Sequence, residues 1–90
     1  MVFTQVVMNK KIKLIWEFRG PTAEQTAKHH VIHLKEYMAL QNFDFDKSAV
    51  DITSEFNCSA YLITNEEYLQ QLRSDLKPNR GTYYNPKENE

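Results

Sequence analysis

The 90-residue sequence lacks the features that mark several large classes of protein. Its single cysteine, Cys58, excludes an internal disulfide framework and is typical of a reducing compartment. No segment approaches the run of roughly 18 apolar residues that a membrane helix requires. Residues 2–8 are short, interrupted by polar side chains and without the basic start of a signal peptide. We therefore expect a cytoplasmic protein with no targeting segment and no membrane partner.

An excess of charge of one sign is also missing. The chain has 11 basic and 12 acidic residues, which gives a net charge of −1 with the histidines neutral. Such a balance provides no positive field for nucleic acid, and the glycine-aromatic signature of RNA-binding sheets is absent. Tyr61, Tyr83 and Tyr84 could stack on bases if they lined an open sheet face. On balance, the composition argues against a nucleic-acid partner.

What the sequence does contain is a clear change of hydrophobic period at Gly20. Residues 11–19 alternate in the manner of a half-buried strand. On the polar side of that strand Ile15 is the one apolar residue. The inward side carries four apolar residues: Ile12, Leu14, Trp16 and Phe18. Gly20 can end the strand. Because the hydrophobic period changes there, we expect a helix to follow directly.

That helix has several possible start signals. Pro21 suits the first helical position, and Thr22 with Gln25 offers a capping box one position later. Steps of 100° place Ile32 nearly opposite the apolar stripe, where we expect it to be exposed or in a contact. The stripe itself, which should face the sheet, consists of Ala23, Ala27, His30, Val31, Leu34, Tyr37 and Met38.

The remainder of the chain predicts three more strands and a second helix. Residues 49–55 alternate, and residues 59–63 form the next strand. Thr64–Glu67 has the sequence of a capping box with acidic residues in the first turn. Residues 81–84 form a short final strand. The apolar stripe of the second helix is Leu69, Leu72 and Leu76.

This element order predicts an α+β domain of the ferredoxin-like kind. Right-handed crossovers turn βαββαβ into a four-stranded antiparallel sheet with both helices on one face. Residues 2–8 could add a strand in front or form an extended leader. We expect one domain over residues 1–85 and a disordered C-terminal tail over residues 86–90. The uncovered sheet face with Ile15, the exposed Ile32 and the small size together favour a homodimer.

The same topology suggests an anion site at one edge of the sheet. The end of the first strand, at Arg19 and Gly20, should lie near the start of the last strand at Arg80. Because the positive end of the first helix opens there, Thr22 and free amides could join the two guanidinium groups. The simpler alternative is two ordinary surface arginines paired with carboxylates.

The three histidines lie together in the first helix and allow two further interpretations. His29, His33 and Glu36 share one flank at a spacing that can hold a divalent metal, although a solvated helix flank has the same pattern. His30 lies in the core-facing stripe, where it could be a general base or a neutral histidine bonded to the protein. No motif positions a nucleophile, and we expect no cofactor.

The sequence thus supports a small soluble homodimeric domain that binds a small anionic ligand or a protein partner. The first alternative is a small dimeric enzyme of the α+β-barrel type that uses His30 as acid and base. The second is a histidine-based metal-binding domain. Whether the protein is an enzyme stays open at this point. A deep apolar cavity that reaches His30 would favour the enzyme, whereas a filled core would favour the binding module.

Overall fold

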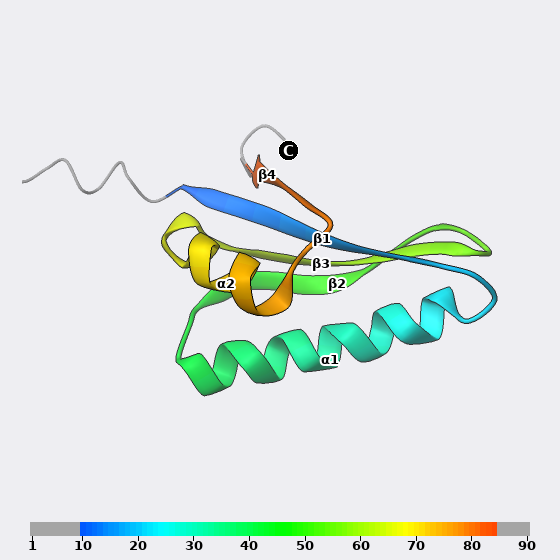
Figure 1. Ribbon diagram of the computed structural model, residues 1–90, viewed down its shortest axis with the longest axis horizontal. Coiled ribbons are helices and arrows are strands. Elements are labelled where there is room, and N and C mark those ends of the chain that lie inside the picture. Colours follow the sequence, from blue (N-terminus) through cyan, green and yellow to red (C-terminus); the bar gives the residue numbers. More distant parts are fainter. Residues whose placement is uncertain (1–9, 85–90) are drawn as a thin grey trace, which may run out of the picture.

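Two helices and a four-stranded antiparallel sheet make up the structure, a computed structural model that describes residues 10–84 (Figure 1). The strand order is β2-β3-β1-β4. The elements are β1 (Lys11–Arg19), α1 (Ala23–Gln41), β2 (Phe45–Ser54), β3 (Asn57–Asn65), the short 3-10 turn η2 (Glu66–Tyr68), α2 (Leu69–Leu76) and β4 (Arg80–Tyr84). The predictions made for residues 2–8 and 86–90 lie outside the described residues.

β1 is the central strand, and its two neighbours pair with different lengths of it. β3 pairs with all of β1, from Lys11 opposite Asn65 to Arg19 opposite Asn57. β4 pairs only with the first five residues, and its first residue, Arg80, lies opposite Ile15. The last four residues of β1 therefore have no β4 partner. This offset decides which side chains meet at that edge.

The core lies between the sheet and the helices, as the hydrophobic periods predict. Ile12, Leu14 and Trp16 of β1 are buried, and α1 packs across β1, β2 and β3. His30 and Tyr37 of the predicted stripe are only half-buried, and Ile32 is 53% exposed. Five members of that stripe are buried: Ala23, Ala27, Val31, Leu34 and Met38.

α2 covers the same face of the sheet as α1. Leu72 is fully buried in the cluster that also contains Leu14 and Leu34. The two helices are joined by polar bonds: Tyr37 Oη donates to Asp75 Oδ2 at 2.5 Å, and Gln71 Nε2 donates to the Tyr37 hydroxyl at 3.1 Å. In Figure 1, α1 runs below the strands, and α2 overlaps β2 and β3 in the view. Of the helices within residues 10–84, neither is long and apolar enough to cross a membrane.

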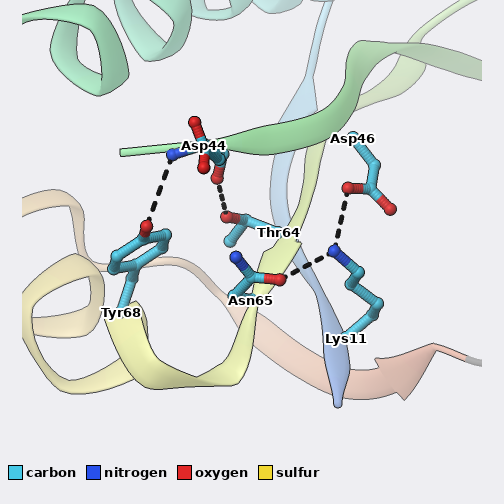
Figure 2. Close-up of polar contacts among 6 residues, drawn as sticks. All are labelled: Lys11, Asp44, Asp46, Thr64, Asn65 and Tyr68. Carbon is cyan, nitrogen blue, oxygen red and sulfur yellow. Dashed lines mark hydrogen bonds and ion pairs between the residues drawn. The ribbon is translucent and has the colours of Figure 1, made fainter. Parts of the chain in front are cut away.

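The predicted capping box at Thr64 is wrong. Thr64 is a buried residue of β3, and its hydroxyl donates to the backbone oxygen of Asp44 at 2.5 Å (Figure 2). Beside it, Lys11 Nζ donates to the side-chain oxygens of Asp46 and Asn65 at 3.1 and 2.7 Å. Because the Thr64 hydroxyl joins β3 to the start of β2, the chain leaves the sheet later, and α2 follows the turn η2.

The start of α1 also differs from the prediction. Pro21 lies in a turn before the helix, which begins at Ala23. Thr22 is the N-cap residue, but its side chain makes no cap hydrogen bond, so the predicted capping box with Gln25 does not form. Gly20 does end β1 as expected: its φ of 106° is a conformation that glycine tolerates, and its N–H donates to the Phe56 oxygen at 2.9 Å.

Candidate ligand-binding groove

A groove of about 540 Å³ lies between α2 and β4, on the helix-covered side of the sheet. Its floor is apolar and consists of Ile12 and Leu14 from β1 and Leu69 from α2. Arg73 of α2 lines one side, and Tyr83 of β4 lines the other. A volume of this size is within the range of small-molecule sites, which are typically about 300–1,000 Å³.

Two sets of hydrogen bonds fix the walls of this groove to β1. Trp16 Nε1 donates to the Leu76 oxygen at 2.7 Å and satisfies a carbonyl in the last turn of α2. On the β4 side, Asn79 donates its backbone N–H to the Ile15 oxygen at 2.9 Å. The Asn79 side-chain oxygen accepts the Glu17 N–H at 2.7 Å. The segment that joins α2 to β4 is therefore fixed to β1 at both ends of its path.

Gly81 shapes the wall that β4 contributes. It lies opposite Leu14, and a Cβ on Gly81 would come within 2.8 Å of the Leu14 Cδ2. Real Cβ atoms do not approach so closely in a well-packed core. The missing side chain lets β4 lie directly against Leu14 and leaves this stretch of the wall as bare backbone.

The charge on the groove is positive. Arg73 is exposed in the last turn of α2, where the helix dipole favours a cation, and no ion pair involving it occurs within residues 10–84. Arg80 lies at the edge of the groove, but it is opposite the outward-facing Ile15, and its side chain pairs with Glu17 on the other face of the sheet, with Nε 2.9 Å from Glu17 Oε2. Tyr83 donates its hydroxyl to Glu66 Oε2 at 2.6 Å, and this hydrogen bond raises the pKa of Tyr83. Arg73 is thus a cation available to an anionic ligand above an apolar floor.

The structure separates the two arginines that the sequence analysis placed together. Arg80 lies opposite Ile15, four residues before Arg19 on β1, which is about 13 Å along a strand. The reason is the segment before β4: Pro78 has no N–H to pair, and the Asn79 side chain takes the N–H of Glu17. Among Arg19, Gly20, Thr22 and Arg80, only Arg80 lines the groove.

The predicted metal ligands lie together on α1 but do not converge on one point. His29 Nε2 and His33 Nε2 are 2.9 Å apart, so one ring donates to the other. Glu36 Oε1 lies 3.5 Å from Nδ1, on the opposite edge of the His33 ring. Within residues 10–84, no three or more His, Cys, Asp or Glu side chains form a cluster that could hold a metal ion.

His30 lies between aromatic rings instead of at a pocket. Its ring centroid is 5.1 Å from that of Trp16 and 5.5 Å from that of Phe18. Desolvation by these neighbours lowers the pKa of His30, and the nearby His33 lowers it further. The buried Nε2 has no hydrogen-bond partner among the described residues. Because His30 does not line the groove, this geometry gives the acid–base interpretation little support.

Sequence reasoning missed Leu69, Arg73 and Tyr83 as groove residues. One signal was present: a glycine inside a strand pattern, as at Gly81, often marks a close backbone approach. Arg73 carried no signal of its own, since an arginine near the end of a helix is ordinary. Comparison with known proteins adds nothing to the groove, since no family model, curated protein or solved structure matches the chain.

Proposed function

We propose that this domain binds a small ligand with an apolar body and one anionic group in the groove between α2 and β4. The observation that carries the proposal is the position of Arg73, a cation with no carboxylate partner among the described residues, beside the apolar floor. The apolar part of the ligand would cover Leu69, and its anionic group would accept charge-assisted hydrogen bonds from Arg73.

Two fluorescent probes with the same apolar rings test this proposal. Anilinonaphthalene sulfonate carries an anion, whereas phenylnaphthylamine is neutral. We expect saturable binding of the sulfonate that weakens roughly tenfold in Arg73→Gln, since a hydrogen bond to a charged group contributes about 1.5–3 kcal/mol. Binding of the neutral probe should not change in that variant, and higher salt should weaken only the sulfonate.

Arg19→Gln is the matched control, because Arg19 is also exposed but lies beyond the part of β1 that lines the groove. An equal loss of sulfonate binding in Arg19→Gln would assign the effect to general charge. Unchanged binding in Arg73→Gln would contradict the proposal.

We also propose a ferredoxin-like fold and self-association of the chain. From the other edge the strand order is β4-β1-β3-β2, and two helices on one face support a ferredoxin-like arrangement. An experimental structure with a left-handed crossover would contradict it. Self-association is supported by the uncovered face of the sheet, and sedimentation at micromolar concentration tests it.

The buried, unpaired Cys58 supports a cytoplasmic location, which cell fractionation tests.

A further inference from the structure

The sheet face opposite the helices, called the open face below, carries its charges in rows. Residues directly opposite one another on neighbouring strands point to the same side, so the register defines rows across the sheet. Between the two irregularities of β2, at Phe45/Lys47 and at Ile52/Ser54, these rows cross three strands without a shift.

Three successive rows differ in character. The first, called the acid row, consists of Asp51, Ser59 and Glu17. The next, called the apolar row, consists of Ala49, Tyr61 and Ile15, with Arg80 at its outer end. The third, called the base row, consists of Lys47, Ile63 and Lys13.

The centre of the open face is apolar and already well packed. Ile63 is only 5% exposed although it lies on the face away from the helices, and its cross-strand neighbours are Lys13 and Lys47. Lys13 Nζ lies 4.5 Å from the centre of the Tyr61 ring. Tyr61 and Ile15 are half-buried. An apolar centre with charges around it is the composition of a protein interface.

We propose that a second copy of this chain covers the open face, about a two-fold axis that runs across the strands along the apolar row. This proposal rests on the proposed self-association and names its surface. The rotation places the acid row of one copy over the base row of the other, so that Asp51 faces Lys47 of the second copy and Glu17 faces Lys13 of the second copy. The apolar row then packs against itself.

Within these three rows, the charge pattern favours this axis over the alternative. A two-fold axis parallel to the strands would place the acid row on the acid row and the base row on the base row, which is repulsive. Sheets that pack face to face are about 10 Å apart with strands within about 30° of each other, a distance that lysine and glutamate side chains span. Arg80 meets Arg80 of the second copy at the end of the axis, and Glu17 then lies between Arg80 of its own chain, 2.9 Å away, and Lys13 of the second copy.

Charge reversal of one row at a time tests the proposed pairing. The acid-reversed variant carries Glu17→Lys and Asp51→Lys, and the base-reversed variant carries Lys13→Glu and Lys47→Glu. We expect each variant alone to dimerise roughly 100-fold more weakly than the wild type, because like charges then face each other. An equimolar mixture should regain dimers, each with one copy of either variant. Sedimentation measures the assembly, and circular dichroism confirms the fold of each variant.

Glu55→Lys with Glu67→Lys is the control of equal charge change, since both residues are exposed and lie off the open face; its dimerisation should match that of the wild type. A monomeric wild type would overturn both the self-association and this surface. If the wild type dimerises and both reversed variants dimerise equally well, the open face is not the interface, although self-association stands. Such a result would point to another surface, such as the exposed Ile32 and Leu40 of α1. Failure of the mixture to dimerise would overturn the proposed axis. Binding of anilinonaphthalene sulfonate in the groove is measured on the same variants. A failure of the proposed ligand binding is then distinguished from a failure of the proposed dimer.

Discussion

His30 is held between Trp16 and Phe18 with a nitrogen that has no partner among the described residues. Burial lowers its pKa below the ordinary value of 6.5, so the unfolded chain binds the proton first as the pH falls. The free energy of unfolding should therefore fall as the pH drops from about 6.5 towards the lower pKa of the folded state, and then level off.

His30→Leu should remove this acid-side slope and raise the free energy of unfolding by about 1 kcal/mol at neutral pH, because it removes an unsatisfied buried group. Denaturant titrations at a series of pH values measure both effects. His29→Leu, next to it but exposed, is the control and should keep the slope. An identical slope in His30→Leu would show that His30 is solvated in the folded protein.

Trp16 contributes a hydrogen bond that joins β1 to the end of α2. Its indole N–H satisfies the Leu76 oxygen at the end of α2. Trp16→Phe keeps an aromatic ring but leaves that carbonyl without its donor, so the free energy of unfolding should drop by about 1–3 kcal/mol. Tyr83→Phe also removes a polar bond, to Glu66, but at an exposed position, and its melting temperature should stay near that of the wild type. Equal stability of the two variants would contradict the anchoring role of Trp16.

The junction between β1 and α1 depends on backbone conformation more than on capping. Gly20 has φ 106°, with open space where a Cβ would lie. Gly20→Ala should therefore destabilise by more than about 1 kcal/mol through strain alone. Thr22→Ala should have little effect, since the Thr22 side chain makes no cap bond. Chemical denaturation compares the two; a neutral Gly20→Ala would contradict the assigned backbone conformation.

At the scale of elements, hydrophobic periodicity predicted β1, β2 and the two helices, but it did not predict where they begin and end. The alternation in β1 and the stripe of α1 reflect burial, which the spacing of apolar residues in the sequence indicates. Thr64 has the residue type of an N-cap, yet its hydroxyl bonds to Asp44, twenty residues away in sequence. A local signal could not show this competitor, because the competing acceptor arrives only when β2 pairs with β3.

At the scale of the whole molecule, the sheet carries its two proposed functional surfaces on opposite faces. The groove is lined by inward residues of β1 such as Ile12, whereas the open face is formed by outward ones such as Ile15. Dimerisation through the open face should therefore leave the groove accessible. The base-reversed variant, Lys13→Glu with Lys47→Glu, should bind anilinonaphthalene sulfonate within about threefold of the wild type, a difference below 1 kcal/mol. If the base-reversed variant loses sulfonate binding when its dimer dissociates, the ligand would instead lie between the two subunits.

The candidate site was less predictable than the fold for a physical reason. That β1 and β4 are antiparallel neighbours follows from the element order, but their register follows from Pro78 and Asn79, whose bonds to β1 appear only in three dimensions. An offset of four residues moved Arg80 away from Arg19. The groove lies between α2 and β4, which are each bonded to β1, and a one-dimensional pattern does not encode where these bonds form.

We propose that a small apolar anion binds between α2 and β4. Backbone amide chemical shifts, followed by NMR during a titration with anilinonaphthalene sulfonate, test it most directly because they locate the ligand. Saturable shifts centred on Leu69, Gly81 and Tyr83, and strongly reduced in Arg73→Gln, are the predicted result. Shifts centred on Arg19, Gly20 and Thr22, or scattered over the open face, would contradict it.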